Sequence, residues 1–242
     1  MHTMGQTFDK RYILTAIQLM GPIVMIWAMF QYAALAWVTA TLIMFFLMRF
    51  IGGSIFYHRV HCHRTHDVHP WVEIIGTALG FYGSFIPPAD FCMTHFNHHK
   101  YADTELDPHN HSMQGWRTLF PILWNITDQV DFRTVIRLKR NKVISLFSDK
   151  YWLLVPLPLL LLIVSLQAFL FLFLIPCTLS IWSTALSTTN HDENGAKNMG
   201  FWYGVFSGAE HLHKNHHGNG DVGEEGWIVA IADVIAIKRV KK

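Results

Sequence analysis

Two long stretches of this chain contain no charged side chain. Residues 12–48 and residues 151–190 lack Asp, Glu, Lys and Arg, over 37 and 40 residues respectively. A single helix of that length would extend about 55–60 Å at about 1.5 Å per residue, whereas the hydrocarbon core of a bilayer is about 30 Å thick. Each stretch therefore predicts two antiparallel transmembrane helices, near residues 12–30, 33–52, 151–166 and 168–188.

The distribution of positive charge predicts how these helices are oriented. Four spans place both termini and the central segment on one side of the membrane. All 19 Lys and Arg residues lie outside the uncharged stretches, and such residues mark the cytoplasmic side. We therefore expect an all-α integral membrane protein, a single domain over residues 1–242, with a cytosolic cap formed by residues 53–150 and 189–242. Every histidine lies on that cytoplasmic side.

Composition argues against several other classes of protein. The formal net charge of +2 gives no basis for binding nucleic acid. The three cysteines form no paired motif, so neither a disulfide framework nor a thiolate metal site is expected. The first apolar run is long and lacks a small-residue cleavage site, so no cleavable signal peptide is expected.

The cap also contains segments that predict helices outside the bilayer. Residues 71–86 are apolar but short for a span, and they predict a helix at the membrane surface. Residues 128–150 are polar and basic, and they predict a surface helix. Residues 227–240 predict a small amphipathic helix with a basic end, which either rests on anionic headgroups or is simply solvated.

The spacing H-x-x-H-H occurs twice, about 120 residues apart. On a helix, positions i, i+3 and i+4 share a face, so each copy presents three imidazoles together and two such helices can hold a pair of metal ions. A further tract, the first along the chain, contains five histidines between residues 58 and 69. Helical geometry there allows His58 to pair with His61 or His63 with His66, and spacing alone does not identify the ligands.

The type of ligand limits which metal ions the site can bind. Carboxylates dominate magnesium and calcium sites, and structural zinc sites are usually built with cysteine motifs that this chain lacks. Sites made of imidazoles suit iron, copper, zinc or nickel. Beside a bilayer, such a redox metal is suited to activating oxygen against an acyl chain.

The histidine segments resemble those of a known family. The chain contains, in this order, HRVHCHR from His58, HFNHHKYADTELDPH from His95 and EHLHKNHH from Glu210. These segments resemble the three histidine boxes of the membrane fatty acid desaturases, and they are most similar to the acyl-CoA (stearoyl-type, delta-9) branch. The run ADTELDPH is the most specific part of a resemblance that covers about residues 52–217. It implies a cytosolic di-iron centre between a four-helix membrane stalk and a cap.

The resemblance implies nine iron ligands. It selects two histidines of the first tract, and it adds one histidine ahead of the third box. The implied set is His58, His63, His95, His98, His99, His191, His213, His216 and His217. The remaining cap histidines are expected to form hydrogen bonds instead of binding iron; they are His61, His66, His69, His109, His111 and His211.

This chain departs from the family pattern at several positions. Phe96 stands where the second box has Arg, and Ser187 stands where the subgroup has an Asn linked to the metal through water. The H-x-G-W segment after the second box is missing. Ser187 and four carboxylates are expected to surround the ligands, the carboxylates accepting hydrogen bonds from imidazole N–H groups unless they are merely surface residues. They are Asp103, Glu105, Asp107 and Glu210.

Together these features predict an O2-dependent desaturase that introduces a cis double bond, at the delta-9 position, into a saturated acyl chain. The implied cofactors are two iron ions, and O2 is the cosubstrate. The acyl group would be carried by CoA, by a carrier protein or by a membrane lipid, and a ferredoxin or cytochrome b5 would supply electrons. One alternative is a related membrane di-iron hydroxylase or oxygenase that acts on a lipid. Another is a histidine-rich metal transporter, which predicts histidines or acids within the spans; both uncharged stretches lack them.

Overall fold

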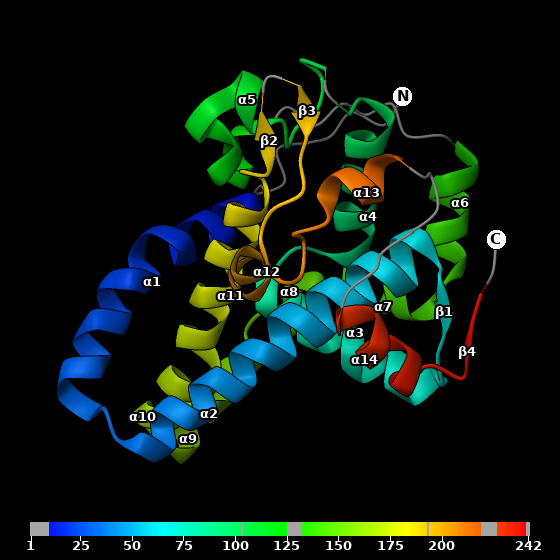
Figure 1. Ribbon diagram of the computed structural model, residues 1–242. Helices are drawn as coiled ribbons and strands as arrows, with labels where there is room; N and C mark the ends of the chain where they lie inside the picture. Colours follow the sequence, from blue (N-terminus) through cyan, green and yellow to red (C-terminus); the bar gives the residue numbers. More distant parts are fainter. Residues whose placement is uncertain (1–9, 103, 125–131, 193, 219–226, 241–242) are drawn as a thin grey trace.

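The computed structural model describes residues 10–102, 104–124, 132–192, 194–218 and 227–240. Within these residues the chain is mostly helical, with two small two-stranded sheets. The long apolar helices extend from one end of the molecule, and most of the shorter helices gather at the other end (Figure 1). Asp103 lies outside the described residues, so its expected role has no structural account.

Three helices are long and apolar enough to cross a membrane by length and composition. Helix α1 spans Arg11–Tyr32. The second helix runs over Leu35–His63, with α2 (Leu35–Phe46) continuing directly into η1 (Leu47–His63). The third covers Leu166–Ser187 and consists of α10 (Leu166–Phe169), η5 (Leu170–Leu174) and α11 (Ile175–Ser187). These helices match the predictions for residues 12–30, 33–52 and 168–188, although the second extends eleven residues further than predicted.

The helix predicted near residues 151–166 is not a single straight helix. Its residues form α8 (Tyr151–Leu154), η4 (Leu157–Leu160) and α9 (Leu161–Val164). Pro156 and Pro158 account for the interruption, because proline lacks the backbone N–H that a helix interior requires. Only together with α7 (Lys142–Asp149) is this segment long and apolar enough to cross a membrane, as a pair of helices bent by 71°.

Glycines allow a close crossing between η1 and α3 (Pro70–Ser84), the helix predicted over residues 71–86. A Cβ atom on Gly80 would lie 2.7 Å from the carbonyl oxygen of Gly52, and one on Gly76 would lie 2.1 Å from the ring of Phe56. Small residues at such positions let two helix backbones approach each other. This contact fixes α3 against the helix that carries the first histidine tract.

The remaining helices are shorter. They are α4 (Pro88–Lys100), α5 (His111–Gln114), η2 (Gly115–Leu119), η3 (Pro121–Leu123), α6 (Phe132–Arg140), α12 (Phe201–Ser207), α13 (His213–Gly218) and α14 (Trp227–Ile235). The surface helix predicted over residues 128–150 is two helices, α6 and α7, and residues 128–131 lie outside the described part of the chain.

Two antiparallel strand pairs join distant segments. β1 (His66–Asp67) pairs with β4 (Lys238–Arg239), and β2 (His191–Asp192) pairs with β3 (Gly195–Ala196). The amphipathic helix predicted over residues 227–240 therefore ends at Ile235, and its basic end forms β4 beside the first histidine tract.

Candidate metal centre

The first three histidines of the first tract, His58, His61 and His63, lie on a π-helix. Hydrogen bonds in a π-helix join residues five apart, so η1 brings His58 and His63 to the same face, and their ring centroids are 4.7 Å apart. The α-helical pairs considered from the sequence, three residues apart, do not form there. His61 instead contacts Thr77 Oγ1 through Nε2 at 2.7 Å. The π-helix ends where Arg64 adopts a left-handed conformation, with φ of 55°.

Four other histidines outside the implied set, His66, His69, His111 and His211, also have separate environments. His66 follows the π-helix on β1, and its Nε2 lies 3.1 Å from Asp233 Oδ1. His111 Nδ1 lies 2.9 Å from Thr118 Oγ1. His69 is exposed, and His211 is buried with Nδ1 unpaired within the described residues.

Helix α4 carries the first H-x-x-H-H copy. Pro88 occupies its first turn, a position that proline tolerates because the first N–H groups of a helix have no partner within the helix. His95 and His98 are buried, whereas Phe96 points to another surface and packs beside Cys62 and Cys92. The position at which this chain departs from the second box therefore faces away from the histidines.

Five imidazoles form a first group. Their ligand atoms lie within 4.8 Å of one another. The Nε2 atoms form a continuous series of contacts, with distances of 2.7 Å, 3.0 Å, 2.8 Å and 3.2 Å in order along it. The series runs through His63, His95, His99, His216 and His58.

A second group lies beside the first. Ligand atoms of His98, His213 and His217 lie within 4.8 Å of one another, and the Nε2 atoms of His98 and His217 are 2.9 Å apart. The His191 ring from β2 lies 4.9 Å from the ring of His213. His191 Nδ1 lies 3.3 Å from the carbonyl oxygen of Thr188, an acceptor that holds the proton on Nδ1 and leaves the lone pair on Nε2.

The two copies of H-x-x-H-H divide their residues between the groups in opposite ways. In α4, His95 and His99 belong to the first group and His98 to the second. In α13, His216 belongs to the first group, whereas the first and last residues of the copy belong to the second. Each helix therefore contributes to both groups, and α13 lies beside α4 (Figure 1).

Among the predicted carboxylates that the structure describes, Asp107 has the closest contact with a histidine. Its Oδ1 lies 2.7 Å from His98 Nδ1, and both side chains are almost completely buried. A carboxylate only accepts hydrogen bonds, so His98 carries its proton on Nδ1 and presents the lone pair of Nε2 to the second group. Glu210 Oε1 lies 3.8 Å from His58 Nδ1.

Glu105 and Ser187 were also expected to surround the ligands. Glu105 is exposed. Ser187 borders the cavity described below, but its hydroxyl donates to the carbonyl oxygen of Thr184 at 2.7 Å.

Burial lowers the pKa of several of these imidazoles. Removal from water, followed by the influence of neighbouring histidines, lowers the pKa of His99 to about 3 and the pKa of His217 to about 3. The same two causes lower the pKa of His95, His98 and His213 well below its usual value. A neutral imidazole keeps a lone pair on one ring nitrogen, which is the form that binds a metal.

The donors present fit metal ions. Metal–nitrogen bonds of about 2.1 Å at right angles place neighbouring nitrogen atoms about 3 Å apart, which agrees with the Nε2 distances of 2.7–3.2 Å in the first group. In the second group, both ring nitrogens of His213 are buried with no hydrogen-bond partner in the described part of the chain. An unpaired buried polar atom costs about 1–3 kcal/mol, and a bound cation would remove that cost.

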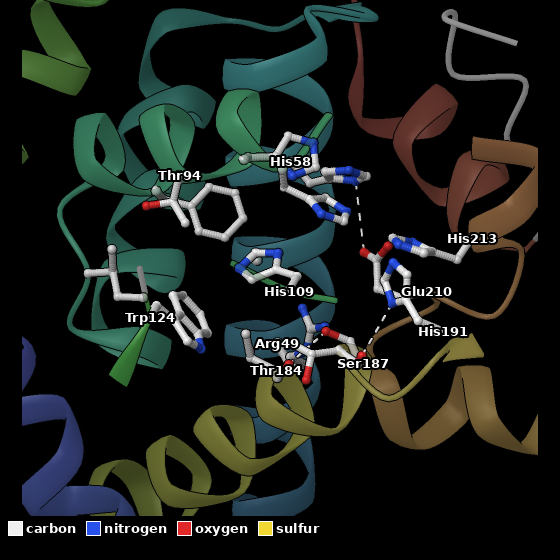
Figure 2. A pocket seen from close by; sticks show the side chains of 16 residues that line it. Arg49, His58, Thr94, His109, Trp124, Thr184, Ser187, His191, Glu210 and His213 are labelled. Carbon is white, nitrogen blue, oxygen red and sulfur yellow. Dashed lines mark hydrogen bonds and ion pairs between the residues drawn. The ribbon is translucent and has the colours of Figure 1, made fainter. Parts of the chain in front are cut away.

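Both groups border one cavity of about 80 Å³. Figure 2 shows His58, His191 and His213 around this space, with Trp124 on the opposite wall. Ile86 and Phe91 complete an apolar side. The arrangement can hold a small apolar group against two adjacent metal positions.

Sequence reasoning missed several residues that border this cavity. Arg49 is buried, and its guanidinium donates to Ser183 Oγ at 3.0 Å and to Ser54 Oγ at 3.3 Å. Trp124 Nε1 donates to the carbonyl oxygen of Thr118 at 2.8 Å. The first charge after an uncharged stretch is a signal that could have identified Arg49, since buried ionisable residues at membrane helices are usually functional.

The chain matches the family model described as Fatty acid desaturase over residues 32–222. It is 25% identical to Delta-9 acyl-lipid desaturase 2 of Arabidopsis thaliana over 250 residues, which cover 93% of this chain and 76% of that protein. It is 24% identical to the sn-1 stearoyl-lipid 9-desaturase of Anabaena variabilis over 202 residues, covering 78% of this chain and 72% of that protein. For the sn-2 palmitoyl-lipid 9-desaturase of Nostoc sp. (strain 36), the identity is 25% over 187 residues, or 69% of this chain and 64% of that protein.

Proposed function

The chain belongs to the fatty acid desaturase family, and on that premise we propose that it introduces a cis double bond at the delta-9 position of a saturated acyl chain, with O2 as cosubstrate. The observation that carries this proposal is the pair of imidazole groups on one cavity. Nine histidines would hold two iron ions, five in the first group and His98, His191, His213 and His217 in the second.

The bound irons would supply the oxidising power needed to remove hydrogen from an unactivated methylene. The overall reaction consumes O2, two electrons and two protons, removes one hydrogen from each of two adjacent carbons, and yields one double bond and two molecules of water. The protein's own contribution is to position the acyl chain. The apolar wall formed by Ile86, Phe91 and Trp124 would hold two adjacent carbons beside both histidine groups and keep bulk water out.

We propose that the substrate is an acyl chain carried by a membrane lipid. The relatives from Arabidopsis thaliana, Anabaena variabilis and Nostoc are named acyl-lipid, stearoyl-lipid and palmitoyl-lipid desaturases. Helix α3 also exposes Trp71, Ile74 and Ile75, a surface suited to the interface of a bilayer. Acyl-CoA and acyl carrier protein are the other carriers to be tested. Electrons would come from a ferredoxin or a cytochrome b5.

The position of the centre supports a four-span topology. The second and third apolar helices end at His63 and Ser187, next to ligands of the same centre, so both helices would end on one side of the membrane. The chain must then cross once between residues 64 and 165. The segment Tyr151–Val164 is about 21 Å long at about 1.5 Å per residue, and it would make that crossing as a short, broken span.

The helix over residues 35–63 also supports a site just outside the bilayer. Its 29 residues extend for about 43 Å, which exceeds the bilayer core of about 30 Å. The excess length would carry His58 and His63 beyond the lipid. We propose that this side is the cytoplasm, with both termini on it, and that residues 1–242 form one desaturase domain.

Expression in a desaturase-deficient host, followed by gas chromatography and mass spectrometry of the fatty acids, tests this function. We expect a new cis-monounsaturated acid with the double bond between carbons 9 and 10, in cells that carry the wild-type chain and in cells that carry the exposed-histidine variant His69→Ala. A hydroxylated acid without an alkene would replace the proposal with a membrane hydroxylase. Metal uptake without any oxidised lipid would favour a transporter.

A further inference from the structure

An exposed aromatic surface lies directly before the third histidine box. Residues 198–209 contain no charged side chain, and within them α12 covers Phe201–Ser207. Trp202 and Phe206 lie one turn apart and are 72% and 65% exposed, and Phe201 is 56% exposed. Contiguous apolar side chains of this kind mark a surface that contacts another protein or a membrane.

Two hydrogen bonds place α12 against the last turns of α11, the end of the third apolar helix (Figure 1). Tyr203 Oη donates to the carbonyl oxygen of Leu186 at 2.6 Å, and Ser183 Oγ donates to the carbonyl oxygen of Phe206 at 2.6 Å. Because later residues of α12 contact earlier residues of α11, the two helices run antiparallel. Ser183 lies about 6 Å before the end of the apolar helix at Ser187, at about 1.5 Å per residue. The C-terminal end of α12 therefore lies within the length of that helix.

The second apolar helix contacts the same end of α12. The Arg49 guanidinium donates to the carbonyl oxygen of Ser207, and Ser54 Oγ donates to the carbonyl oxygen of Gly208. Arg49 lies about 21 Å from Leu35, where this apolar helix begins, at about 1.5 Å per residue. That length is shorter than the bilayer core of about 30 Å. Both apolar helices thus place the C-terminal end of α12 at the depth of hydrocarbon.

The hydrogen bonds at this helix end suit a site without water. The last carbonyl groups of a helix have no partner within the helix, and lipid offers them none. Three consecutive carbonyl groups here each accept a hydrogen bond from a side chain of η1 or α11; they belong to Phe206, Ser207 and Gly208. Gly208 has φ of 74°, and a Cβ atom on it would collide with the Arg49 guanidinium. The two apolar helices therefore supply the donors that water supplies to an exposed helix end.

We propose that α12 is a re-entrant helix, which enters the half of the bilayer next to the metal centre and presents Phe201, Trp202 and Phe206 to the acyl chains of membrane lipids. Its inner side is held by Arg49 and two serines, and the chain returns from the lipid at Gly208 directly before the third histidine box. The segment 189–242 then lies only partly outside the membrane. This inference rests on the spans proposed above and does not depend on the chemistry of the metal centre.

Nitroxide labels on single introduced cysteines measure the depth of α12. The full-length variants Ile23→Cys, Trp202→Cys and Lys214→Cys would be labelled and placed in phosphatidylcholine vesicles. Ile23 is exposed on α1 and represents lipid, whereas Lys214 is exposed on α13 and represents water. The three native cysteines are buried, and the unsubstituted chain measures background labelling. The readout is the ratio of collision rates with O2, which is enriched in lipid, and with a water-soluble nickel chelate.

The label at residue 202 should show a ratio severalfold above that of Lys214→Cys and close to that of Ile23→Cys. Labels in Phe201→Cys and Phe206→Cys add a test of direction, because the antiparallel course predicts a higher ratio at residue 206 than at residue 201. A ratio at residue 202 equal to that of Lys214→Cys would place α12 in water and overturn the proposal.

Dilution of labelled chains with unlabelled chains separates lipid from a second copy of the protein as the occupant of this surface. Spin–spin broadening at residue 202 that disappears on dilution would show that another copy covers α12, which also overturns the proposal. We expect a spectrum that does not change on dilution. A label at Ile23→Cys that collides freely with the nickel chelate would instead overturn the spans proposed above.

Discussion

The two histidine groups share helices α4 and α13, yet their side chains are held differently. In the first group, five Nε2 atoms form a continuous series of contacts at 2.7–3.2 Å, and all five residues lie on helices. In the second group, His191 comes from strand β2, and His98 is oriented by Asp107. The first group is thus built from helix geometry, whereas the second depends on supporting residues. We expect the second group to be the easier one to disturb.

Double-bond formation should fall most when a histidine that contacts ligands on another helix is replaced. His216 Nε2 contacts both His58 and His99, and His98 provides the corresponding link from α4 to the second group. We expect His216→Ala and His98→Ala each to reduce double-bond formation by more than about 100-fold, since even residues behind metal ligands contribute about 10- to 100-fold. Gas chromatography measures the product, and immunoblots of the membrane fraction show that the protein is present.

The matched control for these variants is His69→Ala, which alters an exposed histidine. It should retain wild-type activity. Full activity in His216→Ala or in His98→Ala would remove that residue from the proposed set of ligands.

A smaller effect is expected from Asp107, which supports only the second group. Asp107→Asn keeps the shape of the side chain but removes the negative charge that fixes the proton on His98 Nδ1. We expect metal affinity of the second group to fall by about 10- to 100-fold, with the first iron retained. Iron analysis at increasing chelator concentration distinguishes the two ions. Equal loss of both irons would mean that the groups are not independent.

The apolar helices were predictable because length and lack of charge are sufficient to identify a span. The structure has helices at Arg11–Tyr32 and Leu166–Ser187, close to the predicted residues. The third predicted helix is present only as short helical segments, because the length argument did not consider Pro156 and Pro158, both visible in the sequence. The C-terminal end of the second helix could not be predicted from the sequence. The part beyond residue 52 contains charged side chains, and contacts with distant segments bury it.

The site was predictable only to the extent that residue spacing determines which side chains share a face of a helix. Both copies of H-x-x-H-H lie on helices, as the spacing indicates. The division of each copy between two groups depends on the neighbouring helix, and no local pattern contains that information. The pairing of His58 with His63 needs a π-helix, which the α-helical rule does not consider. His109, whose ring borders the cavity, lies in an irregular segment after α4, where periodicity does not set side-chain direction.

Acid should affect the two groups alike, unlike the substitutions above. His99 of the first group and His217 of the second both have a pKa of about 3 in the folded protein, against about 6.5 in an unfolded chain. Below about pH 6.5 the unfolded state binds more protons, so stability is retained above that pH and is lost as the pH falls toward 3. We expect at most about 1.4 kcal/mol for each histidine per pH unit.

Thermal unfolding of the metal-free protein between pH 7.5 and pH 5 measures this effect. The variants His99→Gln and His217→Gln should each show a weaker dependence on pH, by similar amounts. A change confined to one variant would show that the two groups differ in burial as well as in construction.

His61 lies on the same π-helix as the first group but outside it. Its Nε2 contacts Thr77 Oγ1 on α3, so it joins two helices and does not face the metal positions. We expect His61→Ala to lower the free energy of unfolding by roughly 1–2 kcal/mol while both irons remain bound. Chemical denaturation in detergent measures the first quantity and iron analysis the second. A variant without iron would place His61 in the first group and overturn the assignment of His58 and His63.

The smallest effect should come from the outer face of α4. The guanidinium of Arg137 on α6 lies 5.1 Å from the centre of the Phe96 ring, a cation–π contact worth about 0.5–1 kcal/mol at such a site. Because Phe96 faces away from both groups, Arg137→Ala should reduce stability by about that amount and leave iron content and product formation unchanged. Arg137→Lys, which keeps the charge, should have a smaller effect on stability. If Arg137→Ala instead releases iron, the outer face of α4 supports the histidines, and the departure at Phe96 affects the centre after all.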